Sequence, residues 1–307
     1  MITDMALDFS TTPSLTGDQQ TWSYDVAFRR NLGLIDEAEQ AKLRHSRVAI
    51  AGMGGVGGVH LITLARLGIG AFHIADPDQF ETANFNRQYG AMVRNLGQDK
   101  VDVMAQEALQ INPDLQLKTF SGAIDERTVG EFLEGVDVFI DGIDFFCIAA
   151  RKLLFREACK RGIWSITAGP LGFSTAWLVF DPKGMSFDEY FDLRDDMPEV
   201  DQVAAMAVGL CPAATHIKYL DLRHVDLKSG RGPSAGLACQ LCSGVAAAEV
   251  LKILCNRGTL RPAPYYCQFD AYRQMFRRGY LWWGNRHPLQ RLKRAILRKR
   301  LLAESIK

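Results

Sequence analysis

The stretch RVAIAGMGGVGGVH, which runs from Arg47 to His60, carries the clearest structural signal in the chain. Apolar residues 48–51 lead into a glycine-rich segment, after which a helical pattern begins. The glycines that fit or extend the spacing G-x-G-x-x-G are Gly52, Gly54, Gly55 and Gly57. A strand, a tight turn and a helix start in this order place backbone N–H groups against a phosphate. The stretch therefore predicts a nucleotide-binding turn.

The segments around this turn alternate between apolar runs and helical patterns. We expect strands at 47–51, 71–75, 115–120, 136–140 and 164–167, and helices at 56–67, 100–110 and 148–161. Continuous apolar strands separated by helices are typical of parallel strands that are covered on both faces. The predicted fold class is α/β, with a Rossmann-like, mostly parallel sheet and helices on both faces.

The second half of the chain is less regular. We expect a strand at 175–182, a small-residue helix at 243–254 and a last strand at 265–269. The polar segment 184–236 is predicted to be a long irregular loop. Residues 1–20 are expected to form a loose arm. These patterns divide the chain into an N-terminal arm with helices (1–45), a nucleotide-binding domain (46–285) and a basic tail (286–307).

The composition, with 48% hydrophobic and 23% charged residues, is that of an ordinary globular protein. The first 20 residues have neither a basic start nor an apolar block, so we expect no signal peptide. The sequence contains no run of 18 apolar residues, so we expect no membrane span. Seven cysteines, an odd number, indicate reduced thiols in a cytoplasmic protein rather than a disulfide framework.

A carboxylate follows the second expected strand. Asp76 stands where a Rossmann-like fold hydrogen-bonds the ribose hydroxyls of an adenine nucleotide. The glycine turn and this acid together do not distinguish NAD from ATP. The segment after Asp76 does distinguish the two nucleotides, because it supplies polar and cationic side chains within 25 residues of that acid: Asn84, Arg87, Gln88 and Lys100.

Cations at this place suit a triphosphate better than a dinucleotide. Attack at the α-phosphorus of ATP develops charge on the departing pyrophosphate, which Arg87 and Lys100 would stabilise. Asp144 ends the segment VDVFIDGID, beyond another strand. A carboxylate facing a triphosphate is expected to hold Mg²⁺, and Asp141 is close enough to assist.

The order and spacing of these residues over 46–168 resemble the ubiquitin-activating-enzyme-like superfamily, which includes the ThiF and MoeB adenylyltransferases. The resemblance is carried by the glycine turn, Asp76, the motif NFNRQ (Asn84–Gln88), Lys100 and the motif DGID (Asp141–Asp144). It implies a Rossmann-like fold that binds ATP and Mg²⁺ and converts a carboxylate into an acyl-adenylate.

The resemblance also implies roles for individual residues. Asp76 would bind ribose, Arg87 and Lys100 would bind phosphates, and Asp144 would bind Mg²⁺. The family inserts an arginine from a partner subunit into the site, and Arg29 or Arg30 lies at the matching distance before the glycines. We therefore expect a homodimer. The acceptor would be a ubiquitin-like or sulfur-carrier protein, a peptide or a tRNA-linked carboxylate.

Alternative functions remain at this point. The motifs GIGAFHIADPD, NFNRQ and INP also resemble tRNA threonylcarbamoyladenosine dehydratases. Two alternatives belong to other functional classes: an NAD-dependent oxidoreductase and a non-catalytic nucleotide-binding protein. Phe145 replaces the asparagine that the family usually has after the second aspartate, which puts one polar contact in doubt.

The cysteines have several interpretations. Cys239 and Cys242 form one CxxC pair just before the helix expected at 243–254, but the second pair of the family's zinc site is absent, so we expect no zinc. Cys211 in GLCPAA and Cys242 are candidates for forming a thioester with the activated acyl group, and ordinary packing is the alternative for both.

The tail 286–307 contains eight Lys or Arg residues and one Glu, a charge of +7, whereas the whole chain carries +1. The rest of the chain therefore carries −6. Leu289, Leu292 and Ile296 form an apolar stripe on the helix expected there. A basic amphipathic helix can contact anionic membrane or RNA, or can pack on its own protein. We expect a cytoplasmic protein, which would be peripheral to the membrane if the tail contacts anionic lipid.

Overall fold

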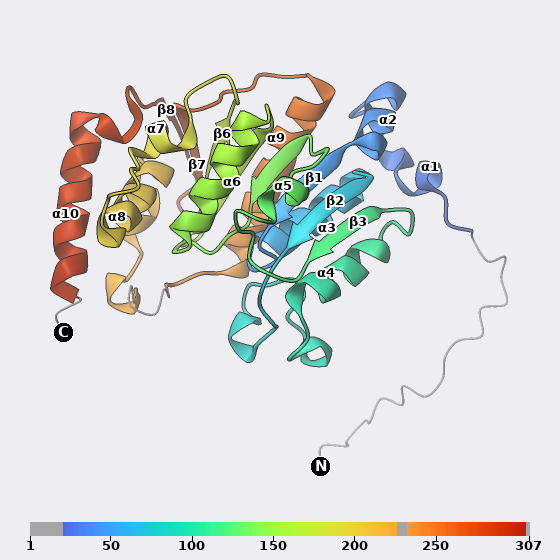
Figure 1. Cartoon of the computed structure of the whole chain (residues 1–307), viewed down its shortest axis with the longest axis horizontal. Coiled ribbons are helices and arrows are strands. Elements are labelled where there is room, and N and C mark those ends of the chain that lie inside the picture. The colour runs from blue at the N-terminus through green and yellow to red at the C-terminus, as the bar shows by residue number, and fades with distance from the viewer. Residues whose placement is uncertain (1–20, 226–231, 305–307) are drawn as a thin grey trace, which may run out of the picture.

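In the computed structural model, which describes residues 21–225 and 232–304, an eight-stranded sheet runs through the molecule in the order β3-β2-β1-β4-β5-β6-β7-β8 (Figure 1). The strands pair in parallel from β3 to β5, and β6, β7 and β8 add antiparallel. The strands are β1 (Arg47–Ala51), β2 (Ala71–Ala75), β3 (Gln116–Phe120), β4 (Val138–Asp141), β5 (Trp164–Leu171), β6 (Ser174–Phe180), β7 (Tyr265–Asp270) and β8 (Met275–Tyr280).

Helices cover both faces of this sheet (Figure 1). The α-helices are α1 (Tyr24–Ala27), α2 (Glu37–His45), α3 (Gly57–Leu67), α4 (Lys100–Leu109), α5 (Val129–Phe132), α6 (Ile148–Lys160), α7 (Phe187–Phe191), α8 (Glu199–Leu210), α9 (Gly236–Cys255) and α10 (Pro288–Glu304). Short 3₁₀ helices occur in the connections, among them η1 (Arg29–Asn31), η2 (Thr82–Asn84) and η4 (Thr215–Lys218). The architecture confirms the predicted fold class.

Two hydrophobic cores follow from the two faces of the sheet. Helices α3, α4 and α9 pack on one face, around residues such as Leu61, Met104 and Val250. Helices α5 to α8 pack on the other face, around residues such as Phe132 and Tyr190. All residues of β2 and β4 are buried, which explains why their sequences are mostly apolar, apart from His73 and Asp141, rather than alternating.

The prediction of a long irregular loop at 184–236 was wrong, because this segment contains α7 and α8. Ser186 caps α7 in a capping box with Glu189, and Pro198 stands at the N-cap of α8. Both are recognisable helix-start signals that the scattered Asp and Gly residues obscured. The arm expected at 1–20 lies outside the described residues.

Two other elements differ from the expectation. Strand β8 was missed, since its sequence MFRRGY has two charges and no apolar alternation. Helix α9 begins at Gly236, so the pair Cys239 and Cys242 lies inside it rather than before it. Helix α9 is long and apolar enough to cross a membrane by length and composition, but it packs on β5, β6 and α3 as a core helix.

The carboxyl ends of the parallel strands meet at one edge of the sheet, the carboxyl edge. Going along it, Phe120 of β3, Asp76 after β2, the glycine turn after β1 and Asp141 of β4 follow one another. Strand β6 begins, and β7 ends, at the same edge, since Ser174 pairs with Asp270. Ligands of open α/β sheets bind beyond this edge.

The first prediction concerns His60, which is fully buried in α3 and whose ring nitrogens have no hydrogen-bond partner among the described residues. Burial lowers the pKa of His60 to about 3. Because the unfolded side chain binds a proton near pH 6.5, stability is lost as the pH falls from about 6.5 towards 3, by at most about 1.4 kcal/mol per pH unit.

The variant His60→Leu removes this contribution. Urea denaturation at pH 7, 5.5 and 4 should show that the wild type loses more stability than His60→Leu on acidification. Parallel pH profiles for the two proteins would contradict the assignment of a buried, neutral imidazole.

Candidate functional site

The glycine turn is shaped by close backbone contacts. Gly52 has φ +88, a conformation that L side chains rarely adopt. A Cβ on Gly57 would overlap the carbonyl oxygen of Gly52, and a Cβ on Gly142 would lie 2.6 Å from the same oxygen. These three glycines are therefore required by the packing of β1, α3 and the end of β4.

Gly54, by contrast, is not explained by packing. A Cβ on Gly54 would make an ordinary contact, 3.6 Å from Gln88 Nε2. In the described part of the chain, the backbone N–H groups of Gly54, Gly55 and Val56 donate to no protein acceptor. They precede the first turn of α3, where the helix dipole favours negative charge. The turn is thus an open anion-binding cradle.

Asp76 fixes this cradle in place. Its Oδ2 accepts from the N–H of Met53 at 2.6 Å, and its Oδ1 accepts from the N–H of Asp78 at 2.8 Å. Burial raises the pKa of Asp76, while these two N–H groups and Lys100 oppose the rise. The predicted ribose ligand is therefore also the group that ties the turn to the segment after β2.

The motif Asn84–Gln88 lies against the turn. The Cγ of Arg87 would be 3.7 Å from a Cβ on Gly55, and its guanidinium donates to Ala83 O and Asn86 Oδ1. Gln88 is buried beside Gly54, and its Oε1 has no partner among the described residues. Asn84 is buried and accepts from the N–H of Glu81, so it shapes the loop.

Lys100 lies at the start of α4 and is buried. Its Nζ donates to Asp78 Oδ2 at 2.9 Å, and its backbone N–H donates to Asp78 O. The lysine side chain is 7% exposed and the aspartate side chain 65%. The pair therefore places a buried positive group beside Asp76, and its partner carboxylate is exposed to solvent.

The two aspartates of the motif DGID have different roles. Asp144 is exposed; its Oδ1 accepts from the N–H of Phe146, and its Oδ2 has no hydrogen bond to any described residue. Asp141 is buried and pairs with Arg151 Nε at 2.7 Å, while Thr167 also donates to it. The suggestion that Asp141 assists a metal is corrected, because its charge is neutralised by a buried arginine.

Arg151 holds the whole segment after β4. Besides Asp141, it donates to the carbonyl oxygens of Ile143 at 2.7 Å and of Asp144 and Phe145 at 3.2 Å. Phe145 itself packs at the edge of the second core and against Phe146. The residue that departs from the family pattern therefore contributes its ring to packing and its carbonyl to Arg151.

The segments after β2 and β4 face each other across the turn. Cys147, at the N-cap of α6, interacts electrostatically with both Asp144 and Asp78. Burial and then Asp144 raise the pKa of this thiol, so it is not an activated nucleophile. The predicted residues Gly52–Gly57, Asp76, Arg87, Gln88, Lys100 and Asp144 thus gather at the carboxyl edge.

Arg29 and Arg30 lie elsewhere. Both are exposed in η1, where Asn31 donates to the carbonyl oxygen of Leu67 at the far end of α3. An eleven-residue helix is about 16 Å long, so these arginines are a helix length away from the glycine turn of their own chain.

The thiols proposed as acyl acceptors are buried. Cys211 is 4% exposed, donates to Gln268 and lies 3.5 Å from His216 Nδ1, and burial raises its pKa to about 12. Cys242 is fully buried beside Thr175, and burial raises its pKa further. The structure does not support either thiol as an accessible nucleophile, because burial disfavours the thiolate.

Sequence reasoning missed three residues that build the site: Asp78, Arg151 and Cys239. Cys239 Sγ would lie 3.2 Å from a Cβ on Gly55, and burial raises the pKa of this thiol to about 11. Asn86 donates to Ser234 O and accepts from the N–H of Gly236, so α9 begins directly over the motif that contains Arg87. These contacts join distant segments and leave no local signature.

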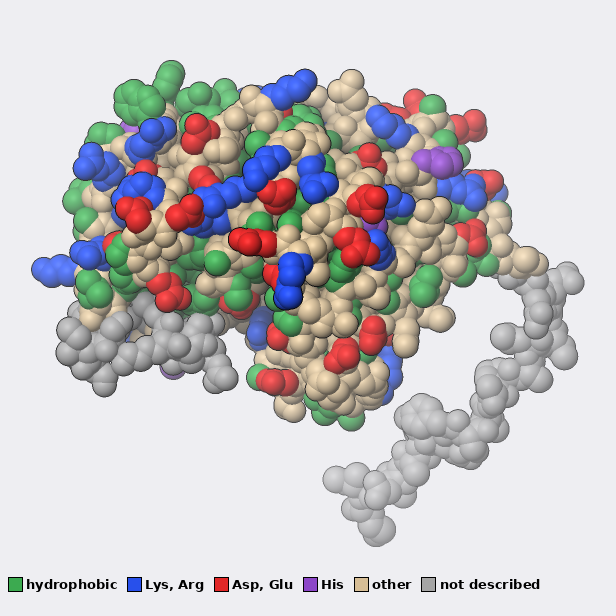
Figure 2. Space-filling view, viewed as in Figure 1, with side chains coloured by type: hydrophobic (Ala, Val, Ile, Leu, Met, Phe, Trp, Pro, Cys, Tyr) green, Lys and Arg blue, Asp and Glu red, His purple; other side chains and the backbone are tan. Residues whose placement is uncertain are grey.

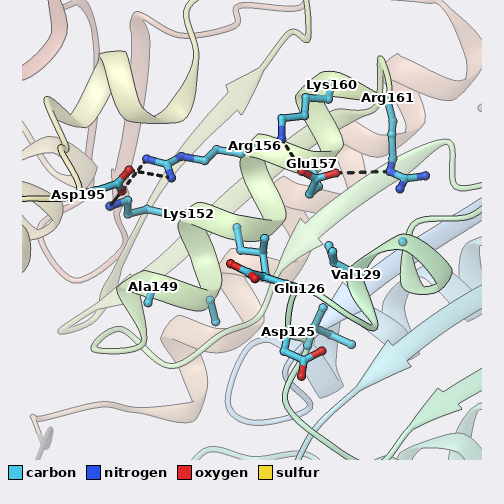
Figure 3. Close-up of a pocket in the computed structure, with 14 residues that line it drawn as sticks. Asp125, Glu126, Val129, Ala149, Lys152, Arg156, Glu157, Lys160, Arg161 and Asp195 are labelled. Atoms are coloured by element: carbon cyan, nitrogen blue, oxygen red, sulfur yellow. Dashed lines mark hydrogen bonds and ion pairs between the residues drawn. The ribbon is translucent and has the colours of Figure 1, made fainter.

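A separate surface hollow of about 710 Å³ lies between α5 and α6 (Figure 3). Its lining combines cations such as Lys152 and Arg156 with acids such as Glu157 and Asp195. The cations are already paired, Lys152 and Arg156 with Asp195 and Lys160 with Glu157. None of the residues that surround the glycine turn lines this hollow.

Comparisons with known proteins agree with this geometry. The sequence pattern that describes the ThiF family matches residues 28–287. The tRNA threonylcarbamoyladenosine dehydratase of Bacillus subtilis is 35% identical over 137 residues, which cover 44% of this chain and 53% of that protein. The sulfur carrier protein ThiS adenylyltransferase of Escherichia coli is 32% identical over 147 residues, covering 47% and 56%. The chain thus spans about half the length of the curated relatives it matches.

Solved structures show the same fold over more of the chain. PaaA superposes with a TM-score of 0.63 at 19% identity, covering 90% of this chain and 77% of the other. Escherichia coli MccB with ATP superposes with a TM-score of 0.61 at 16% identity, covering 86% and 72%.

The second prediction compares Gly57, which is required by backbone packing, with Gly54, which we expect to contact the nucleotide. Gly57→Ala should destabilise the protein by about 3 kcal/mol, because the new methyl group overlaps the Gly52 carbonyl. Gly54→Ala should keep the melting temperature but weaken ATP binding about tenfold, because the methyl group occupies the cradle. Thermal denaturation and calorimetric ATP titration measure both effects. Equal melting temperatures for the two variants would contradict this distinction.

The third prediction uses the two aspartates as a matched pair. Asp141→Asn should cost about 3 kcal/mol of stability, since it leaves the buried Arg151 without its counter-charge. Asp144→Asn should change stability by less than about 0.5 kcal/mol, because the side chain is exposed. Urea denaturation compares the two variants, and a reversed order would show that the loop is held differently.

Proposed function

The chain belongs to the ThiF family, and we propose that it is an ATP-dependent adenylyltransferase that converts a carboxylate into an acyl-adenylate. One observation carries the proposal: the unpaired N–H groups of the turn, the cations Arg87 and Lys100 and the free carboxylate oxygen of Asp144 lie together at the carboxyl edge. A dinucleotide needs only the turn and a ribose acid, whereas a triphosphate needs the cations as well. This argues against an NAD-dependent oxidoreductase.

The proposed reaction follows from where charge develops. A carboxylate oxygen of the acceptor attacks the α-phosphorus, and the bond to the bridging oxygen of the β-phosphate breaks, so pyrophosphate leaves with that oxygen. The N–H groups of Gly54–Val56 would orient the phosphates, and Arg87 and Lys100 would stabilise the departing charge. Lys100 would exchange Asp78, its solvent-exposed partner, for a phosphate.

Asp144 suits a magnesium ion. The described residues contain no group of three or more potential metal ligands, which fits an ion held by one carboxylate, water and the phosphates of the substrate. The free Oδ2 of Asp144 would be its protein ligand. When bound, Mg²⁺ would neutralise part of the triphosphate charge.

We also propose a homodimer in which Arg29 or Arg30 enters the site of the partner copy. Both side chains are exposed, and both lie a helix length from the turn of their own chain. A contribution to catalysis would therefore have to be made to another copy.

A tRNA-linked carboxylate is a second candidate acceptor, favoured by an aromatic cluster at the carboxyl edge. Phe173, Tyr219 and Tyr272 have ring centroids 5.2–5.6 Å apart, and Tyr272 is 68% exposed. Nearby Lys218 and Arg277 are in no ion pair within the described ranges. Exposed rings beside free cations are typical of surfaces that stack single-stranded bases. The relatives named as tRNA threonylcarbamoyladenosine dehydratases point the same way.

The fourth prediction tests adenylation directly. In the presence of Mg²⁺ and a competent acceptor, the protein should exchange labelled pyrophosphate into ATP, and NAD should not compete. Arg87→Ala and Asp144→Ala should each lower the exchange rate at least about 100-fold, equivalent to roughly 3 kcal/mol of transition-state stabilisation. The acceptors to compare are ubiquitin-like proteins, peptides and tRNA carrying a carboxylate.

Two controls make the result interpretable. Cys211→Ala should retain exchange, because adenylation precedes any transfer to a thiol. Tyr272→Ala should reduce exchange with the tRNA acceptor alone if the aromatic cluster binds RNA. Tight NAD binding without ATP binding would refute the proposed function.

A further inference from the structure

Helix α10 docks on the protein through a face that is not its apolar stripe. Gln290 and Leu301 are buried, and Gln290 donates to the carbonyl oxygen of Val208 in α8. Arg294 pairs with Asp192 and Arg298 pairs with Asp201, both at 2.6 Å. The helix is therefore held against α7 and α8 by polar and ionic contacts, together with Leu297 and Leu301, which pack at the second core.

The apolar stripe consequently faces outward. Leu289 is 61% exposed, Leu292 58% and Ile296 49%. Their spacing of three and four residues places them on one side of the helix, opposite to Gln290 and Leu301. An apolar stripe that lies outside a docked helix is unusual, because burial of such residues normally drives docking.

Two exposed tryptophans precede the start of the helix. Trp282 and Trp283 are 62% and 61% exposed in the segment between β8 and α10. Apolar side chains project at the top left of the molecule, above the start of α10, and apolar and basic side chains mix along the left margin that α10 forms (Figure 2). The tryptophans directly precede α10 in the chain, and α10 forms this margin of the molecule.

The cations around this margin are of two kinds. Arg294 and Arg298 are engaged with α7 and α8, and Lys293 donates to the carbonyl oxygen of Pro212. The other exposed cations form no ion pair with any residue that the structure describes, and they are Arg286, Arg291, Lys299 and Arg300. The margin is therefore apolar at its centre and positive at its borders.

We propose that this margin, made of Trp282, Trp283, the stripe of α10 and the four free cations, docks on the surface of an anionic lipid bilayer. An interfacial helix buries an apolar face at the boundary of headgroups and acyl chains, while Lys and Arg contact anionic headgroups. Tryptophan prefers the same depth. The surface of an anionic bilayer could thus contact the stripe, the tryptophans and the cations at the same time.

Other binding partners would pair with only part of this surface. A two-fold contact with a second copy would bring the four free cations of each chain close to those of the other. An RNA would pair with the cations but would leave the aliphatic stripe in water. The proposal is independent of adenylation, since none of these residues borders the glycine turn.

Vesicle sedimentation with the full chain tests the proposal. The protein should bind vesicles of phosphatidylcholine with 30% phosphatidylglycerol at least about tenfold more strongly than vesicles of phosphatidylcholine alone. Leu292→Gln with Ile296→Gln should reduce binding at least about tenfold at every salt concentration, because apolar burial persists in salt. Lys299→Gln with Arg300→Gln should reduce it mainly at low salt.

Matched controls come from the same chain. Val93→Gln replaces an apolar side chain that is 78% exposed in another part of the surface, and Arg66→Gln replaces an exposed cation there. Both should bind like the wild type. Tryptophan emission should shift to shorter wavelength with anionic vesicles and be quenched by brominated lipids.

Three results would overturn the proposal. The first is equal binding by all variants, and the second is no binding of the wild type to anionic vesicles. The third is a change from dimer to monomer in Leu292→Gln with Ile296→Gln on size-exclusion chromatography, which would make the margin an interface between copies. Pyrophosphate exchange should be unchanged in every variant, so loss of lipid binding is distinguishable from failure of the proposed enzyme function.

Discussion

Three backbone segments meet at the carbonyl group of Gly52, and the site depends on that meeting. The end of β1, the start of α3 and the end of β4 approach so closely that Gly57 and Gly142 leave no room for a Cβ. The N–H of Gly142 donates to Ala51 O, and that of Gly52 donates to Ala75 O, so the turn is bonded to both neighbouring strands. Neighbouring strands are about 4.8 Å apart, which fixes how far Asp76 and Asp144 can lie from the cradle.

Buried charges then hold the loops around this point. Asp76 uses both carboxylate oxygens to fix the turn and the segment after β2, and Arg151 uses its whole guanidinium to fix the segment after β4. Planar donors and acceptors of this kind give directional, charge-assisted hydrogen bonds. These side chains are committed to the protein, whereas the N–H groups of the turn, the Oε1 of Gln88 and the Oδ2 of Asp144 have no partner among the described residues. The same motifs thus contain residues that fix the loops and residues that are free to bind a ligand.

The sequence predicts the parts of this arrangement that are local. A glycine turn between a strand and a helix, and carboxylates at strand ends, follow from spacing alone, as do the parallel strands. The buried partner of Asp141 could not be found in this way, because Arg151 has no pattern that distinguishes it from a surface arginine. Cys239 approaches Gly55 only because α9 begins over Asn86. The tail shows the same limit: spacing predicts the stripe of α10, but the face that docks depends on Asp192 and Asp201 in distant segments.

The charge of the tail has a different meaning once its contacts are known. Of the cations that make residues 286–307 so basic, Arg294 and Arg298 neutralise acids of α7 and α8, so part of the contrast between an acidic body and a basic tail is an internal contact. What remains free is concentrated beside the outward stripe. Figure 1 shows α10 along one end of the long axis of the molecule, whereas the carboxyl edge runs across its length. A membrane that contacts α10 would leave the carboxyl edge open from the side, and an acceptor could reach the glycine turn while the protein stays bound.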